Sequence, residues 1–525
     1  MRPIVDSATM RLIEERSLTE GQTIEALMDA VGSQLASHVL TILQKSQQTP
    51  TVVLVAGKGN NGADGYTALA HLLKRKVSCL AWQVAPPAPG SLPERRKAAF
   101  MSKGGTVIEF PQIPEVRGPI LIIDGLYGAG FKGRPDSASA KAILWTNDQS
   151  GLVVSIDVPS GVDPTTGEAL GDAIYADYTL ACHLPTRGCF IGQGWEHAGS
   201  IIFADLPLKT QRSDMCLLEL SDIIPMLPRR HRTQNKFQAG SVAAIAGSSG
   251  MMGAASLACE AAYTVGAGYV RVLLPEALSH ETGQLTREVV KTVVSEEASS
   301  YLPWIAKADS LIVGPGFSRT LQALSRLEAL WPHLNAPGVI DADALFWLSS
   351  KPQEEWNVQN KVLTPHLGEA NRLFRREPAP IDETFLNQVR TAASAAQCTI
   401  VIKGAPTFIF SSGRPVLVMP RGDPGMATAG TGDVLTGMIA GLLAQRLTPL
   451  SAAVLGTYLH GLAGERSSRS KTSYSLTASS LLQAIPSVLF QLLDQATGGL
   501  HRRYVPFGRG EPRKIEDLDF GSSDL

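Results

Sequence analysis

The amino-acid sequence predicts an α/β fold in two domains, and three observations lead to this expectation. The chain has 525 residues, more than one ordinary hydrophobic core accommodates. Short β-branched runs alternate with helical stretches, which is typical of parallel sheets covered by helices. The alternation breaks at a basic, proline-bearing stretch, residues 225–240, and then restarts. We therefore expect domains at residues 1–225 and 226–500, with a flexible tail at 501–525.

Composition excludes several classes of protein. The 47 Lys and Arg nearly balance the 48 Asp and Glu, so no overall field attracts nucleic acid or an anionic membrane. Hydrophobic residues make up 44% and charged residues 18%, as in ordinary globular proteins. The six cysteines form no CxxC pair, which favours reduced thiols. With acids at the N-terminus and no apolar run of about 18 residues, we expect a soluble cytoplasmic protein.

In the first half, apolar runs predict five strands and a glycine-rich ligand loop. The segment GKGNNGADG (57–65) lies between the first strand and a helix expected at 66–75. Glycines there let backbone amides face a ligand, and a helix N-terminus favours anionic groups. The predicted strands are 51–56, 78–84, 119–124, 152–157 and 200–205.

Two later strands of this half also end in polar residues. Asp124 follows one strand, and Asp157 and Ser160 follow the next. Open α/β sheets place their sites along the carboxyl ends of the strands, so these loops are expected to share one crevice with residues 57–65. The alternative is that Asp157 and Ser160 only cap turns, which is a common use of both residue types in loops.

Three segments of this half resemble the NAD(P)H-hydrate epimerase domain, over nearly all of residues 1–220. They read NNGADG (60–65), DGLYGAG (124–130) and SIDVPSGVDPTTG (155–167). The resemblance implies a Rossmann-like three-layer domain that interconverts the R and S epimers of nicotinamide cofactors hydrated at C6, with bound K⁺. It implies Asp157 as the acid/base group and Asn61, Asp124 and Ser160 as potassium ligands, since hard cations take oxygen ligands. The implied hydrate-binding residues are Asn60, Asn61, Gly62, Ala63, Asp64, Gly128, Ala129, Gly130, Phe131, Lys132, Gly133, Arg134 and Asp157.

The sequence departs from this family at two positions. Ala63 stands where the family usually has glycine, and a methyl group would crowd the backbone if φ were positive there. Thr186 stands where the family usually has lysine.

The second half repeats the alternation of strands and helices. A hairpin is expected at 407–411 and 415–420, joined through Gly413. Helices are expected from about residue 253 and, after the hairpin, from about 431 to 446 and on to about 496. The other predicted strands are 241–247, 269–275, 310–316, 338–343, 361–365 and 398–404.

The strongest motif of the chain is GDPGMATAGTGDVLTGMIAGLLAQ (422–445). Its small residues 429–432 open an apolar helix, so their amides converge on a ligand at the helix N-terminus. Asp433 would point toward the same place. The alternative is an Asp that only stabilises the helix dipole, worth about 0.3–1 kcal/mol.

The run AGTGD (429–433) resembles the anion hole and base of ribokinase-like kinases, and further segments resemble the ADP-dependent NAD(P)H-hydrate dehydratase over about 235–495. They are SSGMMGAASLACEAAYTVGAGYVRV, VGPGFSR, TPHLGEANRL, VIKGAPT and YLHGLAGE. The resemblance implies a ribokinase-like α/β domain with Asp433 as the base and Mg²⁺ and ADP as cofactors. It places the hydrate at Ala254, Gly316, His366 and Asp433, and the nucleotide at Lys403, Gly404, Ala405, Pro406, Thr407 and Gly432.

Together the two resemblances imply a bifunctional repair enzyme, an isomerase and a lyase in one chain. It would epimerise R- and S-NAD(P)HX and dehydrate the S epimer at the expense of ADP, giving AMP and phosphate. The expected partners are NADHX, NADPHX and ADP, with no nucleic acid and no membrane, and we expect a homo-oligomer. The alternative is a ribokinase-like small-molecule kinase that carries a non-catalytic N-terminal binding module.

Overall fold

The computed structural model describes residues 1–45, 50–231, 233–496 and 513–517. The chain divides into two compact units. The first unit comprises Pro3–Ser213 with Pro380–Glu383, and the second comprises the remainder. The first unit thus ends upstream of the boundary predicted at residue 225. Most of the predicted tail, 501–512 and 518–525, lies outside the described residues.

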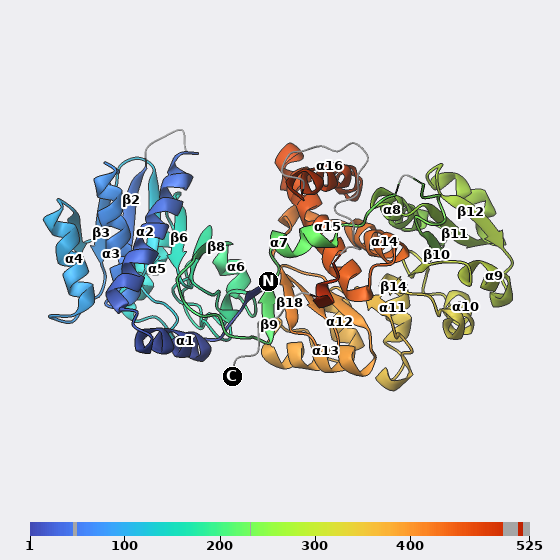
Figure 1. Cartoon of the computed structure of the whole chain (residues 1–525), viewed down its shortest axis with the longest axis horizontal. Helices are drawn as coiled ribbons and strands as arrows, with labels where there is room; N and C mark the ends of the chain where they lie inside the picture. Colours follow the sequence, from blue (N-terminus) through green and yellow to red (C-terminus); the bar gives the residue numbers. More distant parts are fainter. Residues whose placement is uncertain (46–49, 232, 497–512, 518–525) are drawn as a thin grey trace. The chain divides into compact units, whose positions relative to one another are not determined.

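The first unit is built on a parallel sheet of seven strands, in the order β4-β3-β2-β5-β6-β7-β8 (Figure 1). Its central strand, β5, is buried along its whole length and apolar up to Asp124, as expected where helices cover both faces of a sheet. The strands are β2 (Thr51–Ala56), β3 (Cys79–Gln83), β4 (Thr106–Glu109), β5 (Ile120–Gly125), β6 (Leu152–Ile156), β7 (Tyr178–Cys182) and β8 (Ser200–Ala204).

Helices pack two apolar cores against this sheet. Val31, Leu35 and Val39 of one helix, Ile24–Leu43, lie in the core on one face. By length and composition alone this helix could cross a membrane; core helices pass the same test. The helical elements are α1 (Ser7–Thr19), α2 (Ile24–Leu43), α3 (Asn60–Lys74), α4 (Leu92–Ser102), α5 (Ser137–Asn147), η1 (Arg187–Cys189) and α6 (Gly194–Ala198).

The strand order creates a crevice in the first unit. Strand β2 pairs with β3 on one side and with β5 on the other, so the chain leaves the sheet in opposite directions at this point. Ligands of open α/β sheets bind at such a switch, beyond the carboxyl ends of the strands. The loops after β2, β5 and β6 therefore meet at one place.

The predicted glycine loop is shorter than expected, because α3 already begins at Asn60. Gly62 and Gly65 serve close packing rather than a turn. A Cβ on Gly62 would lie 2.6 Å from the Gly57 carbonyl oxygen, and one on Gly65 would lie 2.3 Å from Leu54 Cδ1. Glycine at these sites lets the first turns of α3 pack directly onto β2 and its loop.

The second unit is built on an eleven-stranded sheet, in the order β1-β9-β18-β17-β16-β15-β14-β13-β10-β11-β12. Its pairings from β9 to β12 are parallel except around the β17 hairpin, where β16–β17 and β17–β18 are antiparallel. The strands are β1 (Arg2–Pro3), β9 (Met215–Leu217), β10 (Ser241–Ile245), β11 (Tyr269–Pro275), β12 (Val290–Val294), β13 (Ser310–Val313), β14 (Gly338–Ile340), β15 (Lys361–Leu363), β16 (Thr399–Ile402), β17 (Thr407–Phe410) and β18 (Val416–Met419).

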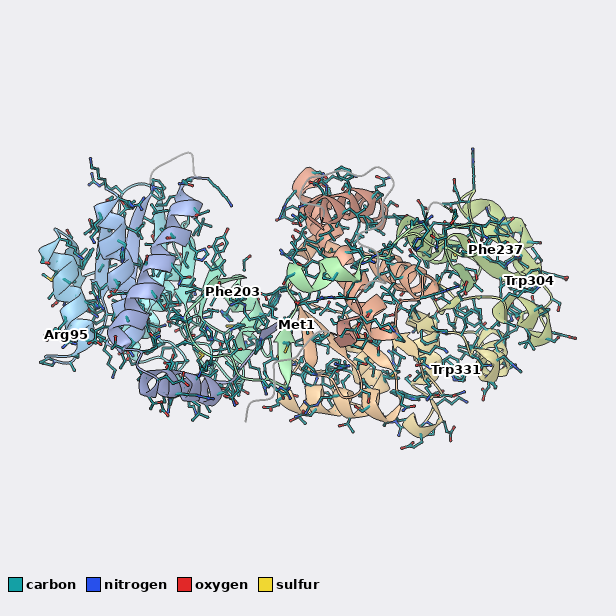
Figure 2. All side chains as sticks on the ribbon, in the orientation of Figure 1. Met1, Arg95, Phe203, Phe237, Trp304 and Trp331 are labelled. Carbon is teal, nitrogen blue, oxygen red and sulfur yellow. The ribbon has the colours of Figure 1, made fainter. Side chains whose placement is uncertain are left out.

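Apolar helices bury one face of this sheet, and side chains fill the interior of the unit (Figure 2). At the surface, the Arg271 guanidinium lies 4.0 Å from the Trp304 ring centroid. The α-helices are α7 (Leu220–Ile223), α8 (Met252–Thr264), α9 (Leu302–Ile305), α10 (Leu321–Leu330), α11 (Ala342–Leu348), α12 (Leu367–Leu373), α13 (Glu383–Ala395), α14 (Thr431–Ala444), α15 (Pro449–Lys471) and α16 (Ala478–Ala496). The 3₁₀ turns are η2 (Ile224–Met226), η3 (Glu276–Gln284), η4 (Ala298–Ser300), η5 (Trp331–His333), η6 (Gln353–Glu355), η7 (Pro424–Met426), η8 (Ser473–Ser475) and η9 (Ile515–Asp517).

The predicted strands are confirmed in both units, each within a few residues of its expected ends. The hairpin is confirmed as well, with Gly413 at φ 67° between β17 and β18. Five strands were not predicted: β1, β4, β7, β9 and β12. The second unit has its own switch point, because β10 pairs with β11 on one side and β13 on the other.

Candidate active sites

A cavity of about 700 Å³ lies at the switch point of the first unit. Its walls are the loops that follow β2, β5 and β6, together with one face of α1. Most of the sequence-predicted epimerase residues line it, namely Asn60, Asn61, Gly128, Ala129, Gly130, Phe131, Lys132, Arg134 and Asp157. Gly62, Ala63, Asp64 and Gly133 are not among its lining residues.

Asp157 is held rigidly at the cavity wall directly after β6. Its φ is 68°, in the left-handed region that non-glycine residues rarely adopt. The backbone amide of Ala129 donates a 2.6 Å hydrogen bond to its Oδ2. Burial raises the pKa of Asp157 to about 6, partly offset by that hydrogen bond. A carboxyl with such a pKa exchanges protons readily near neutral pH.

The charge of Asp157 influences two more carboxyl groups. Glu14 of α1 lines the cavity, and partial desolvation, followed by the charge of Asp157, raises its pKa to about 7. Asp64 of α3 is buried behind the wall, and burial followed by the charges of Asp157 and Glu14 raises its pKa well above the usual range. The sequence alone does not identify Glu14, because a charged residue on an N-terminal helix resembles any solvated one.

The three predicted potassium ligands lie in one connected corner. Asp124 accepts hydrogen bonds from Ser160 Oγ at 2.6 Å and from Ser160 N at 2.9 Å. Asn61 Nδ2 donates to the carbonyl oxygens of Tyr127 and Ile156, at 2.7 and 2.8 Å. Asp124 is fully buried, burial raises its pKa, and no described cationic side chain pairs with it. A buried carboxylate among neutral oxygens suits a monovalent hard cation.

Close approach explains the glycine at position 128. A Cβ there would lie 2.5 Å from Asn61 Oδ1, so any side chain would displace Asn61 from its two carbonyl partners. The loop between β5 and α5 therefore packs onto the start of α3 through Gly128, and it brings the Ala129 amide to Asp157.

The two departures from the epimerase pattern are accommodated. Ala63 is buried inside α3 and is not among the residues with positive φ, so its methyl group meets no backbone strain. Thr186 is fully buried, with its hydroxyl 3.5 Å from Cys189 Sγ. Its neighbour Arg187 donates a 2.9 Å hydrogen bond to Glu383 within the same unit.

In the second unit, Asp433 is the third residue of α14, beside the helix N-terminus. Gly430 precedes the helix with φ 90°, a conformation that glycine adopts without cost. Burial raises the pKa of Asp433 to about 7, and the charge of Asp341 adds to this rise while Lys403 opposes it. A carboxyl of this kind can act as a base near neutral pH.

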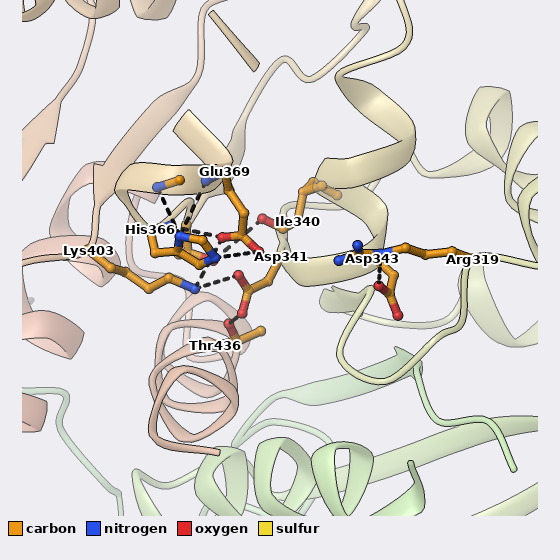
Figure 3. Close-up of polar contacts among 10 residues, drawn as sticks. Arg319, Ile340, Asp341, Asp343, His366, Glu369, Lys403 and Thr436 are labelled. Atoms are coloured by element: carbon orange, nitrogen blue, oxygen red, sulfur yellow. Dashed lines mark hydrogen bonds and ion pairs between the residues drawn. The ribbon is translucent and has the colours of Figure 1, made fainter. Parts of the chain in front are cut away.

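Lys403 pairs with two acidic residues, Asp341 and Glu369 (Figure 3). Its Nζ lies 2.8 Å from Asp341 Oδ1 and 3.9 Å from Glu369 Oε2. The other Asp341 oxygen accepts a 2.6 Å hydrogen bond from Thr436 of α14. A Cβ on Gly432 would lie 3.4 Å from Lys403 Nζ. Lys403 and the amides at the start of α14 thus converge on one point.

His366 lies beside this network and caps α12. Its Nδ1 accepts hydrogen bonds from the backbone amides of Gly368 and Glu369, at 3.0 and 3.3 Å. In turn, the backbone amide of His366 donates a 2.9 Å hydrogen bond to the carboxylate of Glu369. His366 also forms a β-bridge with Lys403. The cap fixes Nδ1 as an acceptor, so the exposed Nε2 carries the proton of the neutral ring.

The other predicted dehydratase residues fall into two groups. Ala254 of α8 and Gly316 after β13 meet, because a Cβ on Gly316 would lie 3.1 Å from Ala254 Cβ. Gly404, Ala405 and Pro406 form the turn between β16 and β17, and Thr407 begins β17. A cavity of about 590 Å³ also lies in this unit, between α15 and α16, but none of the predicted dehydratase residues lines it.

The residues around Lys403 fit a magnesium ion that is bound together with phosphate. Asp341, Glu369 and Asp433 face a single ammonium group, so their ionised forms leave an excess of negative charge. Among the described residues no group of three or more His, Cys, Asp or Glu side chains is arranged to hold a metal. Magnesium typically uses one or two carboxylates and completes its shell with water and substrate phosphate.

Sequence reasoning did not assign Asp341 or Glu369. Asp341 lies within the predicted strand 338–343, directly after the end of β14, and Glu369 lies in the TPHLGEANRL segment. The signal for Asp341 was an acid at the carboxyl end of a buried parallel strand, the same signal that identified Asp124 and Asp157.

Comparisons with known proteins give consistent matches. A family model for NAD(P)H-hydrate dehydratase matches residues 242–487, and one for the YjeF-related protein N-terminus matches residues 24–188. The bifunctional NAD(P)H-hydrate repair enzyme Nnr of Moorella thermoacetica is 33% identical, over 89% of this chain and 93% of its own. The Coxiella burnetii enzyme of the same name is 30% identical, over 92% and 98%.

A solved structure also aligns with the chain. It is a ribokinase-like superfamily protein from Enterococcus faecalis, 26% identical, covering 54% of this chain and 98% of its own, with a TM-score of 0.47. The predicted fold class, a Rossmann-like domain followed by a ribokinase-like α/β domain, is confirmed by the two sheets together with the family matches. With relatives matching over nearly their whole length, this chain belongs to the family of bifunctional NAD(P)H-hydrate repair enzymes.

Proposed function

We propose that the chain repairs hydrated nicotinamide cofactors through two activities. The first unit interconverts R- and S-NAD(P)HX, and the second dehydrates S-NAD(P)HX with ADP, giving AMP and phosphate. The observation that carries this proposal is that each unit places a carboxyl with a pKa near neutrality beside glycine-rich backbone. Asp157 lies in the cavity at the switch point of the first unit, and Asp433 lies at the start of α14 directly after Gly430. Family membership supports the same two activities.

In the first unit, the chemistry centres on the C6 hydroxyl of the hydrate. Protonated Asp157 gives its proton to this hydroxyl, the C6–O bond breaks, and water leaves. The lone pair of the ring nitrogen N1 supports the cation at C6, and water then adds again. Asn61, Asp124 and Ser160 would hold K⁺, which would supply positive charge to the pocket when bound. The cationic side chains of Lys132 and Arg134 suit the pyrophosphate of the dinucleotide.

In the second unit, Asp433 takes the proton of the C6 hydroxyl. The hydroxyl oxygen attacks the terminal phosphorus of ADP, and AMP leaves. Phosphate then departs as the C6–O bond breaks with help from N1, and loss of a C5 proton restores NAD(P)H. The amides at Gly430–Gly432 and the ammonium of Lys403 stabilise the transferring phosphoryl group. Mg²⁺, held by Glu369 or Asp341, would supply further positive charge there.

The rival proposal, a small-molecule kinase with a non-catalytic N-terminal module, requires a stable phosphorylated product. Family membership does not favour it, and Asp157 and Asp124 are both in place in the first unit. The kinase proposal predicts no release of free phosphate, so a phosphate assay separates the two proposals.

We further propose a cytoplasmic homo-oligomer. All six cysteines are free thiols, as in reducing compartments. Leu321 and Phe490 expose 85% and 60% of their surface and are candidates for a contact between copies. Light scattering on purified protein should give a multiple of 55.9 kDa; a monomer would contradict the oligomer, and cell fractionation tests the compartment.

The proposed function is tested by recovery of nicotinamide absorbance from a mixture of both NADHX epimers, with ADP, Mg²⁺ and K⁺. Complete, ADP-dependent recovery with equivalent phosphate release is expected. A plateau at the amount of S epimer initially present would contradict the epimerase activity, and the absence of any recovery would contradict the dehydratase activity.

A further inference from the structure

Helix α1 presents one face to the cavity of the first unit. Ser7, Met10, Arg11 and Glu14 line the cavity, and their spacing of three, one and three residues places them along a single helix face. The loops after β2, β5 and β6, including Asp157, form the other walls. Figure 1 shows α1 lying across one end of the sheet of this unit. Glu14 is the carboxyl that α1 contributes to the cavity lining, and its residue is exposed.

Glu14 lies in helix α1, whereas Asp157 lies in a loop with left-handed backbone. The two carboxyls are linked electrostatically, because the charge of Asp157 raises the pKa of Glu14. Asp157 is fixed by its left-handed backbone and by the Ala129 amide. Burial and then Asp157 raise the pKa of Glu14 to about 7, Arg11 lowers it, and Glu15 raises it slightly. The buried Asp64 responds to both charges. The remaining charged lining residues are Lys58, Lys132, Arg134 and Asp136.

We propose that Glu14 is a second acid/base group of the epimerisation, acting on the ring face opposite to the one served by Asp157. This inference rests on the proposed epimerase function. One carboxyl is protonated and the other ionised at the start of the reaction. The protonated group gives its proton to the C6 hydroxyl, the C6–O bond breaks, water leaves, and the N1 lone pair forms the N1=C6 bond. The ionised group then takes a proton from a water molecule whose oxygen attacks C6 on the other face, and the electron pair returns to N1.

Inversion at C6 explains why two groups are needed. The new oxygen must arrive on the face opposite to the one that the old oxygen left, and a ring bound between two walls does not turn over. One carboxyl alone can only return water to the face from which it departed. It would therefore exchange the C6 oxygen with solvent and leave the configuration unchanged. After each inversion the two carboxyls have exchanged protonation states, so the pair is ready for the reverse reaction.

The test is to measure inversion and oxygen exchange separately in the full-length chain without ADP. Purified S- or R-NADHX is incubated in H₂¹⁸O, and chromatography with mass spectrometry reports both epimer and isotope. In Glu14→Gln, we expect epimer exchange to fall by at least about 100-fold, while one epimer still gains ¹⁸O with retained configuration. In Asp157→Asn, inversion is also lost, and oxygen exchange persists in the opposite epimer. Glu15→Gln, on the neighbouring residue, should behave as the wild type.

Two further measurements guard against a purely structural effect. Glu14→Asp should restore part of the inversion rate, and the wild-type rate should show a bell-shaped dependence on pH with its maximum between the two pKa values. ADP-dependent dehydration of purified S-NADHX reports that the chain is folded.

A Glu14→Gln protein that inverts at the wild-type rate overturns the inference while leaving the epimerase function intact. If Glu14→Gln loses inversion and all oxygen exchange together, the inference is also overturned. Glu14 would then be needed for the shape of the site and not as a second base. A wild-type protein that does not invert either epimer overturns the proposed function itself.

Discussion

The two candidate sites achieve a similar result by different means. Asp157 in the first unit has a pKa of about 6, accepts a hydrogen bond from a backbone amide, and raises the pKa of two other carboxyls, Glu14 and Asp64. Asp433 in the second unit has a pKa of about 7 and shares its surroundings with Lys403 as well as Asp341. Burial is the main cause of the raised pKa in both. The second site therefore places its base beside an ammonium group that can hold an anion, whereas no described cationic side chain contributes to the pKa of Asp157.

The largest effect should come from Asp433→Asn. Removing the general base lowers ADP-dependent dehydration of S-NADHX by roughly 10²–10⁴-fold, whereas epimer exchange in the first unit continues. Phosphate release and nicotinamide absorbance measure the first activity, and chromatography of the epimers measures the second. ADP binding, followed by calorimetry, should persist; a variant that dehydrates normally would remove Asp433 from the mechanism.

The next effect concerns the charges around Asp433, whose ionised form is the active base. Lys403 lowers the pKa of Asp433 and Asp341 raises it. Lys403→Met should therefore move the rise of dehydration rate to higher pH, and Asp341→Asn should move it to lower pH. Lys403→Met should also slow turnover at least about tenfold, the effect of about 1.4 kcal/mol of lost charge stabilisation.

The control for this pair is Asp343→Asn. Asp343 raises the pKa of Asp433 less than Asp341 does, and it is paired with Arg319 at 2.7 Å. The pH profile of dehydration in Asp343→Asn should move in the same direction as in Asp341→Asn, but by a smaller amount. If the pH profiles of dehydration in Lys403→Met and Asp341→Asn moved in the same direction, neither charge would act on the base as proposed.

A smaller effect should follow from the removal of potassium. Epimer exchange should fall about tenfold, which corresponds to about 1.4 kcal/mol, when K⁺ is replaced by a bulky organic cation at constant ionic strength. Dehydration of purified S-NADHX should change little. Ser160→Ala, which removes the hydroxyl bound to Asp124, should weaken the dependence on K⁺. Equal sensitivity of both activities to K⁺ would argue against a potassium site confined to the first unit.

The smallest effect is on stability, and it has the opposite sign to the effect on activity. The pKa of Asp157 rises from 3.8 to about 6 on folding, so its ionised form destabilises the folded first unit at pH 7. Asp157→Asn should raise the free energy of unfolding there by about 1–3 kcal/mol. This advantage should shrink as pH falls through about 6 toward 3.8, where the wild-type carboxyl becomes protonated. Hydrogen exchange of first-unit peptides at pH 7 and pH 4 measures it; a constant difference at both values would contradict it.

The sequence predicted most of the buried strands, because their apolar runs leave a local signal, but it missed the buried strands β7 and β9. It missed β4 and β12, whose residues are largely half-exposed or exposed at sheet edges, since such strands carry no continuous apolar run. Asp157 and Asp433 were predicted as candidate bases from the loops that carry them. Glu14 could not be found in this way, because it lies 143 positions before Asp157 in the chain and only the packing of α1 brings it to the cavity.

The positive φ of Asp157 restricts how this site can change in evolution. Among side chains, Asp and Asn tolerate left-handed backbone best, because their short polar groups bond locally. A glutamate at this position would add a methylene group and adopt the conformation at greater cost, even though its carboxyl has the right chemistry. Asp433 lies in ordinary helical backbone and is free of that restriction. Replacement of Asp by Glu is thus disfavoured by main-chain geometry at position 157, and only by the length of the side chain at position 433.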